Sequence, residues 1–168
     1  MDEKNYYDAI ALGYDELHGE EQLTKLNLIK NNLQDNFLTK DSIILDVGCG
    51  SGISTRFWNC NRTGIDLSKE LIKIAEKKDK LGTYTVESAE NISFKERTFD
   101  VVISLTAIQN FRDINKGLNE IKRVGQNKFI LTVLKKAPNF IKIKELILEL
   151  FNVKQIIVEE KDEIFLIF

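Results

Sequence analysis

The chain has 168 residues, of which 43% are hydrophobic and 30% charged, with a formal net charge of −2 and a pI near 5.6. This length suits one domain that buries roughly two-thirds of its unfolded surface and needs no disulfide bonds. The balanced charge excludes a global basic field for nucleic acid, although a local basic face stays open.

The cysteine and histidine content disfavours a metal centre. Cys49 and Cys60 form no C-x-x-C motif, and His18 is the one histidine. The N-terminal residues lack the basic start and apolar stretch of a signal peptide, and no apolar run approaches the ~18 residues of a membrane span. We therefore expect a cytoplasmic protein with no metal site, disulfide framework or membrane contact.

Hydrophobic periodicity predicts strands and helices in alternation. In chain order, we expect a helix at residues 21–33, strands at 42–47 and 63–68, a helix at 69–78, strands at 83–88 and 99–105, a helix at 114–124, a strand at 128–134, a helix at 139–151 and two strands within 153–168. Ser68 is placed to cap the second helix, Gly125 to end the third in a C′ position, and Pro138 to open the fourth.

The order of these elements predicts an α/β domain. Strand–helix alternation is typical of an open, mostly parallel sheet with helices on both faces. The last two strands are joined by a very short polar turn, so they must pair antiparallel. Ligands of such sheets bind at the carboxyl ends of the strands, where the winding direction reverses.

A dense run of glycines leaves the carboxyl end of the first strand. Gly48, Gly50 and Gly52 form G-x-G-x-G, whereas the dinucleotide fingerprint is G-x-G-x-x-G and would require glycine at Ile53. A tight turn without a ligand is the alternative explanation. Asp66, which closes the second strand, is placed to accept hydrogen bonds from both hydroxyls of a ribose; its alternative role is to cap the helix that follows.

These residues resemble the class I S-adenosylmethionine-dependent methyltransferases. The resemblance is carried, in order, by ILDVGCGSG from Ile44, GIDLS from Gly64, ESAENISF from Glu87 and FDVVISLTAIQNF from Phe99. It implies a single Rossmann-like domain over residues 1–168, with a mostly parallel seven-stranded sheet and an antiparallel C-terminal hairpin strand. Its expected parts are an N-terminal lid segment and helix (1–35), a cofactor-binding half (43–125) and a C-terminal half (126–168).

The resemblance also implies which residues hold the cofactor, S-adenosylmethionine. Asp46 and the glycines should border its methionine moiety, and Asp66 its ribose. In the family an acid after the third strand often meets the adenine amino group, whereas this sequence has serine there. The full set expected at the cofactor is Asp46, Gly48, Cys49, Gly50, Gly52, Asp66, Leu67, Ser88, Ala89, Glu90, Leu105 and Tyr14.

Methyl transfer from a sulfonium mainly requires alignment of the acceptor, and a dedicated base is needed only for a poor nucleophile. Gln109 and Asn110, after the fourth strand, are candidates to orient the acceptor; capping the next helix is their alternative role. His18, near Tyr14 in a tyrosine-rich N-terminal segment, is a candidate base. The D/N/S-P-P-aromatic motif of amide methyltransferases does not follow the fourth strand, which disfavours adenine N6 or glutamine as acceptor.

Within the family, ISLTAIQNF looks most like the small-subunit ribosomal-RNA guanine-N7 methyltransferases, although Asn110 stands where they have an aromatic residue. Such enzymes work with a small zinc-binding activator subunit at the sheet edge. The third strand is an expected edge and is uncharged over residues 83–86, so a similar subunit near Tyr84 is a candidate partner. RNA is a second candidate partner.

Three alternatives stay open at this point. The acceptor is a small metabolite rather than an RNA base, or the chain is a cofactor-binding scaffold that transfers no methyl group. A nicotinamide-dependent oxidoreductase is the third, and Ile53 disfavours it because the dinucleotide fingerprint needs glycine there.

Overall fold

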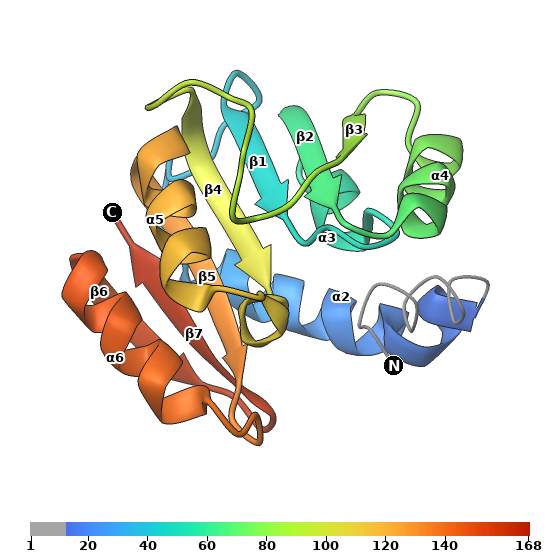
Figure 1. Cartoon of the computed structure of the whole chain (residues 1–168). Coiled ribbons are helices and arrows are strands. Elements are labelled where there is room, and N and C mark those ends of the chain that lie inside the picture. The colour runs from blue at the N-terminus through green and yellow to red at the C-terminus, as the bar shows by residue number, and fades with distance from the viewer. Residues whose placement is uncertain (1–12) are drawn as a thin grey trace.

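The computed structural model describes residues 13–168, apart from the side chains of residues 14–18. Within this range one seven-stranded sheet carries helices on both faces (Figure 1). The strand order β3-β2-β1-β4-β5-β7-β6 confirms the predicted Rossmann-like arrangement. β7 is antiparallel to both of its neighbours and the remaining pairs are parallel, as expected for the hairpin end.

The strands and helices predicted from the sequence occur in the predicted order, with boundaries close to the predicted ones. The strands are β1 (Ile43–Val47), β2 (Asn61–Asp66), β3 (Thr83–Val86), β4 (Phe99–Leu105), β5 (Gly125–Leu134), β6 (Val153–Val158) and β7 (Asp162–Ile167). The α-helices are α2 (Tyr14–Asn32), α3 (Ile53–Phe57), α4 (Lys69–Lys78), α5 (Ile114–Val124) and α6 (Phe140–Leu150), and a 3-10 turn, η2, spans Ile108–Asn110.

Two hydrophobic layers hold the helices to the sheet. α5 and α6 bury residues such as Leu118 and Ile143 against one face. α2 and α3 pack on the opposite face, where Leu26 and Ile29 are fully buried. In a smaller hydrophobic cluster, Ile72 and Ala75 of α4 pack against Tyr84 of β3. Residues that alternate along the central strands enter opposite layers, so the sheet is covered on both sides as parallel sheets require.

The helix predicted at residues 21–33 is longer than expected. As α2 it begins at Tyr14, so Tyr14 and His18 belong to it and do not precede it as we expected. Polar residues dominate this part of the helix and hide its periodicity. Gly19, a poor helix former, is accommodated within α2 beside Ile53. Tyr6 and Tyr7 lie outside the described residues.

Two predicted helix boundaries are corrected. Gly125 has φ −85 and begins β5, so it is not a left-handed C′ residue. Glycine is needed there for space, because a Cβ would come within 2.9 Å of a Val102 methyl group and collide with the Phe129 ring. Pro138 lies before the N-cap residue Asn139, and Phe140 is the first helical residue, so the proline precedes the helix and does not open it.

A loop, rather than the helix implied by strict alternation, connects β3 to β4 across the front of the sheet (Figure 1). Ile92 is buried in the α5 layer, and Phe94 packs against it. Arg123 of α5 donates hydrogen bonds of 2.8 Å to the carbonyl oxygens of both residues, and Glu120 accepts one of 2.9 Å from the Ile92 N–H. Side chains of α5 therefore replace the hydrogen bonds that a crossover helix would make internally.

Candidate functional site

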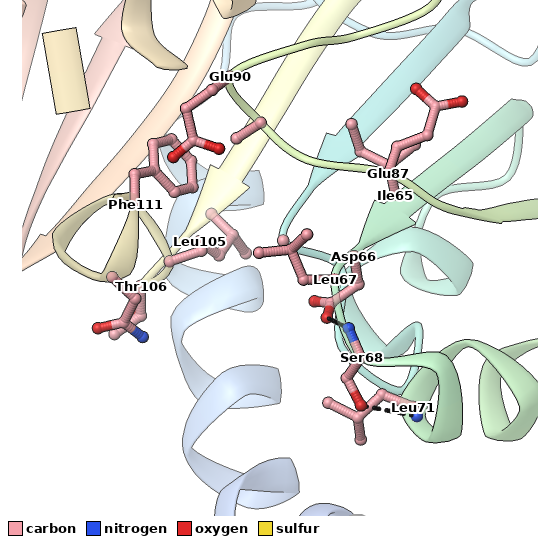
Figure 2. Close-up of a pocket in the computed structure, with 14 residues that line it drawn as sticks. Ile65, Asp66, Leu67, Ser68, Leu71, Glu87, Glu90, Leu105, Thr106 and Phe111 are labelled. Carbon is pink, nitrogen blue, oxygen red and sulfur yellow. Dashed lines mark hydrogen bonds between the residues drawn. The ribbon is translucent and has the colours of Figure 1, made fainter. Parts of the chain in front are cut away.

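A pocket opens at the carboxyl ends of β1, β2 and β4, where the strand order reverses (Figure 2). In Figure 2, Asp66 and Ser68 lie on one side and Glu90 and Phe111 on the other. The full lining is Gly48, Ile65, Asp66, Leu67, Ser68, Leu71, Glu87, Ala89, Glu90, Leu105, Thr106, Ala107, Asn110 and Phe111. This is the place where open parallel sheets bind their ligands.

The glycine loop turns the chain sharply from β1 into α3. Gly48, Gly50 and Gly52 have φ values of 76, 54 and 79, a region that side chains disfavour. The N–H groups of Gly48 and Cys49 both donate to the Ile65 carbonyl, at 2.8 and 3.0 Å, which fixes the loop to β2. A Cβ at Gly48 would overlap the Ala107 side chain, so the ends of β1 and β4 meet without space for one.

The position of the third glycine has a packing cause. Gly52 is the N-cap of α3, and a Cβ on it would lie 2.9 Å from the Tyr84 hydroxyl and 3.1 Å from Ala75. The backbone must therefore pass close to β3 and α4 at this residue. The motif departs from the dinucleotide fingerprint because close approach is required at residue 52 rather than at residue 53.

Asp66 joins the glycine loop to the start of α4. Its Oδ2 accepts a 2.9 Å hydrogen bond from Gly50 N–H, and its Oδ1 accepts one of 2.8 Å from Ser68 N–H. Ser68 Oγ in turn accepts from Leu71 N–H at 3.2 Å, so Ser68 is the side-chain cap of α4 as predicted. Asp66 thus supports the cap rather than being the cap, and it lines the pocket.

Asp46 lies beneath the loop and is not among the lining residues. It is fully buried, and its Oδ2 accepts from Ser54 Oγ at 2.5 Å and from Thr55 Oγ1 at 2.7 Å, both at the start of α3. Burial raises the pKa of this carboxyl to about 6, and the two hydroxyl donors oppose that rise. Among the described residues nothing bonds to the buried Oδ1.

Cys49 is a packing residue of the loop. It lies with Ile72, Ala75 and Tyr84 in the cluster under α4. Burial, with the nearby carboxylates of Asp66 and Asp46, raises the pKa of the Cys49 thiol well above its usual value. A neutral, buried thiol is a weak nucleophile, so this environment does not suit covalent chemistry.

The segment after β3 supplies acids to the pocket even though Ser88 replaces the acid of the family. Ser88 is not a lining residue; its Oγ hydrogen-bonds the Glu90 carboxylate. Glu90 also accepts from Asp113 N–H at 3.3 Å, and, although burial opposes it, hydrogen bonds from Ser88 and the backbone lower its pKa. Ala89, Glu90 and Glu87 line the pocket, and cofactor binding by Ala89 and Glu90 stays a prediction.

The end of β4 forms the opposite wall. Leu105 and Asn110 line it, whereas Gln109 turns away, and its Nε2 donates a 2.7 Å hydrogen bond to the Thr106 carbonyl. The structure therefore gives Gln109 a role in shaping the turn. Tyr14 and His18 lie in α2, but their side chains lie outside the described residues.

Several lining residues were not predicted from the sequence. They are Ser68 and Leu71 as pocket residues, Glu87, and the group Thr106, Ala107 and Phe111. All of them lie within a few residues of a predicted motif at a strand end, which is the signal that could have identified them. Among the described residues, no group of three or more His, Cys, Asp and Glu side chains is arranged to hold a metal ion, and no helix is long and apolar enough to cross a membrane.

Comparison with known families identifies the domain. A family model described as a methyltransferase domain matches residues 45–131, just over half of the chain, and this span includes every residue that lines the pocket. The chain belongs to the methyltransferase domain family. S-adenosylmethionine is accordingly the cofactor, and we propose that this pocket holds it.

The names of individual relatives of this methyltransferase domain point to different substrates. An uncharacterized protein of Methanocaldococcus jannaschii is 33% identical over 134 residues, which are 77% of this chain and 51% of that protein. A demethylmenaquinone methyltransferase of Thermotoga maritima is 33% identical over 100 residues, 56% of this chain and 44% of the enzyme. The 18S rRNA guanine-N7 methyltransferase bud23 of Schizosaccharomyces pombe is 33% identical over 97 residues, 55% of this chain and 36% of that enzyme.

Solved structures share the fold of this methyltransferase domain. The complex between the Haloferax volcanii Trm112 methyltransferase activator and a methyltransferase matches with a TM-score of 0.68 at 22% identity, over 76% of this chain and 59% of that one. A SAM-dependent methyltransferase of Aquifex aeolicus matches with a TM-score of 0.69 at 17% identity, over 84% and 87%. The chain spans about half the length of the curated relatives it matches.

The pocket of this methyltransferase domain fits S-adenosylmethionine chemically. We propose that the Asp66 carboxylate would hold the ribose, and that Ile65 and Leu67, which also line the pocket, would offer apolar surface to the adenine ring. The orphaned Oδ1 of Asp46, close to the glycine loop, is an acceptor of the kind that an ammonium group requires. These matches of chemistry make Asp66 and Asp46 the residues to test.

Asp66→Ala should remove the selectivity for ribose hydroxyls. Each charge-assisted hydrogen bond contributes ~1.5–3 kcal/mol, so we expect the wild-type protein to prefer S-adenosylhomocysteine over its 2′,3′-dideoxy analogue by ~100-fold or more. The variant should bind both ligands about equally in calorimetry. Asp41→Ala, at an exposed position, is the control. A folded Asp66→Ala variant that keeps the full preference would refute the ribose assignment.

Asp46→Asn should change how stability depends on pH. Because the folded-state pKa of about 6 exceeds the ordinary pKa of an aspartate, 3.8, the Asp46 contribution to the free energy of unfolding is largest below about pH 4 and is lost as the pH rises through 6. The variant lacks this loss, so its stability relative to wild type should rise by about 2–3 kcal/mol between pH 4 and pH 7. Chemical denaturation across this range measures the difference, and a constant difference would contradict the assignment.

Proposed function

We propose that this chain transfers a methyl group from S-adenosylmethionine to a base of RNA, with guanine as the leading candidate. The observation that carries the proposal is the two-sided pocket. Asp66 and Glu87 border one side, and Thr106 and Phe111 border the other together with Glu90 (Figure 2). The first side suits a cofactor with many hydrogen-bonding groups, and the uncharged residues after β4, which are Thr106, Ala107, Asn110 and Phe111, suit an uncharged acceptor.

The uncharged residues after β4 bear on the acceptor chemistry. The bound cofactor supplies an electrophilic methyl group on a sulfonium. An acceptor atom that already carries a free lone pair at neutral pH, such as a ring nitrogen of guanine, needs orientation rather than deprotonation. Asn110 can donate or accept a hydrogen bond to orient such a ring, and Phe111 adds an apolar surface beside it.

The basic surface available to RNA is modest. Lys135 and Lys136 follow β5 at the carboxyl end of the sheet, and Lys142 is exposed on α6. Lys144 instead pairs with Glu163 at 2.8 Å, so its charge is largely neutralised. RNA recognition would therefore depend on the base in the pocket and on any partner, more than on the charge of this chain.

The likeness to bud23, an 18S rRNA guanine-N7 methyltransferase, supports the RNA acceptor. The likeness to the demethylmenaquinone methyltransferase of Thermotoga maritima supports the alternative, which is a small metabolite as the acceptor in place of RNA. A scaffold that binds the cofactor without transfer is the third outcome.

Incubation with methyl-labelled S-adenosylmethionine should label RNA. Equal amounts of total RNA, protein and metabolite extract from the native organism are compared, and nuclease digestion followed by chromatography identifies the modified base. We expect label in RNA as a methylated guanine, and at least ~10-fold less label with Asp66→Ala because cofactor affinity falls. Label confined to the metabolite extract would overturn the RNA acceptor, and tight cofactor binding without any label would favour the scaffold.

A second part of the proposal concerns the free edge of β3. β3 pairs with β2 alone, and two exposed apolar side chains lie at its ends: Val86, the last residue of the strand, is 43% exposed, and Leu81, two residues before the strand, is 85% exposed. Tyr84 itself is buried and donates a 2.8 Å hydrogen bond to Asp79, so it faces inward. We propose that a small activator subunit docks on this edge through Leu81, Val86 and the strand backbone. The Haloferax volcanii complex with the Trm112 activator supports a partner of this class.

The register of β3 identifies the available backbone groups. Glu87 N–H donates to the Asp66 carbonyl of β2 at 3.1 Å. Because N–H groups alternate in direction along a strand, those of Thr85 and Thr83 also point toward β2, whereas those of Tyr84 and Val86 point outward. A partner strand would therefore pair with Tyr84 and Val86.

Leu81→Lys with Val86→Lys should abolish partner binding without loss of the fold. Charged residues on an edge strand block the addition of another strand. The tagged wild-type chain should co-purify a small protein from its native organism in near-equal amount, and the double variant should lose it. Val158→Lys, at a 66% exposed position on the opposite edge strand β6, is the matched control. A wild-type chain that purifies alone with full activity would refute the partner.

A further inference from the structure

A buried ion pair links α2, β7 and the end of β4. Lys25 of α2 is 2% exposed and pairs with the fully buried Asp162 at the start of β7. Lys25 Nζ also donates a 2.7 Å hydrogen bond to Thr106 Oγ1. α2, β7 and the end of β4, which are far apart in the sequence, therefore meet at the ammonium group of Lys25. This group lies next to Thr106, which lines the pocket.

Thr106 is held at an unfavourable backbone conformation. Its φ is 55, in the left-handed region, where a β-branched residue is strained. Its N–H donates to Thr132 Oγ1 of β5 at 2.8 Å, and its own Oγ1 lies 3.2 Å from Thr132 Oγ1 and 3.4 Å from Asp162 Oδ2. Such strain costs of order 1–3 kcal/mol and persists only where the surroundings enforce it.

The strained residue is also a wall of the pocket. Thr106 and the next residue, Ala107, both line it, and Ala107 packs so closely on Gly48 that no Cβ fits there. The Thr106 carbonyl accepts the Gln109 side-chain hydrogen bond that shapes η2, which ends at Asn110. The direction in which Asn110 faces the pocket therefore depends on the backbone at Thr106.

We propose that Lys25, Asp162 and Thr132 form a clamp that fixes Thr106 in its left-handed conformation and so positions the acceptor side of the methyl-transfer site. The three are positioning residues, since none of them lines the pocket. The inference rests on the proposed methyltransferase function for its kinetic consequence, and on the geometry alone for its structural consequence.

Stability by itself is a poor explanation for this pair. Removing two charges from water costs about as much as their attraction returns, and apolar side chains of similar volume often replace buried ion pairs without loss. The apolar layer of α2, with Leu26 and Ile29 fully buried, already holds the helix to the sheet. What the ion pair adds is directed hydrogen bonding at one strained residue.

Thr132→Val and Thr132→Ser form a matched pair of variants. Valine keeps the shape but removes the acceptor for the Thr106 N–H, whereas serine keeps the acceptor and loses a methyl group. With valine we expect kcat to fall by ~10–100-fold, because a small misplacement of a positioning group has effects of this size. With serine kcat should stay within ~2-fold, although the buried cavity lowers its melting temperature. Affinity for S-adenosylhomocysteine should change by less than ~3-fold in both.

The second variant is Lys25→Met with Asp162→Leu, which removes both charges together and avoids an unpaired buried charge. It should fold, bind S-adenosylhomocysteine, and show the same loss of kcat. Hydrogen exchange of the Thr106 amide, followed by NMR on the full chain, gives a readout independent of catalysis: exchange should be at least ~10-fold faster in Thr132→Val and in the double variant than in wild type or Thr132→Ser.

The outcomes separate the clamp from the function. Unchanged kcat and unchanged Thr106 exchange in both disrupting variants would overturn the clamp, as would losses of kcat that follow melting temperature in all the variants, serine included. If the wild-type chain transfers no methyl group to any extract, the proposed function fails, and the Thr106 exchange rates still decide whether the clamp exists.

Discussion

The carboxylate of Asp66 is the interaction on which the cofactor side of this domain depends. It accepts one N–H from the glycine loop and another from the residue that caps α4, so three successive segments of the fold are fixed by one charged group. A carboxylate is suited to this role because it accepts several hydrogen bonds at once and keeps lone pairs for a ligand. These hydrogen bonds hold the glycine loop against the end of β2 and the start of α4.

A second constraint operates on the other side of the pocket. There the chain leaves β4 through Thr106 in a left-handed conformation, and the contacts that hold it come from α2, β5 and β7. The two sides are thus organised differently. The cofactor side is built from neighbours in the sequence, with Asp66, Gly50 and Ser68 all within the segment that the family model covers, whereas the acceptor side draws on residues near both ends of the chain.

This difference explains which features of the fold and of the site could be predicted from the sequence. Apolar runs predicted the strands well, and β4 begins and ends at the predicted residues, because strands buried on both faces have a simple pattern. Ser68, Asp66 and the three glycines could be assigned because local backbone requirements select these residue types. The prediction for Gly125 was wrong because glycine is required there by the nearby Phe129 ring, which is a tertiary contact. The prediction for Pro138 was wrong because this residue lies just before the helix and not within it. Lys25 looks like any helix lysine, since its partner Asp162 is far away in the sequence.

The loop from β3 to β4 has a consequence for how this family can diversify. It carries Glu87 and Glu90 into the pocket, yet it contributes no strand or helix to the framework and is fastened at Ile92 and Phe94 by side chains of α5. Insertions or deletions beside Glu87 or Glu90 would alter the depth and charge of this side of the pocket. Because Ala89 and Ile92 belong to the buried core, such a change of length must leave both of them packed under α5.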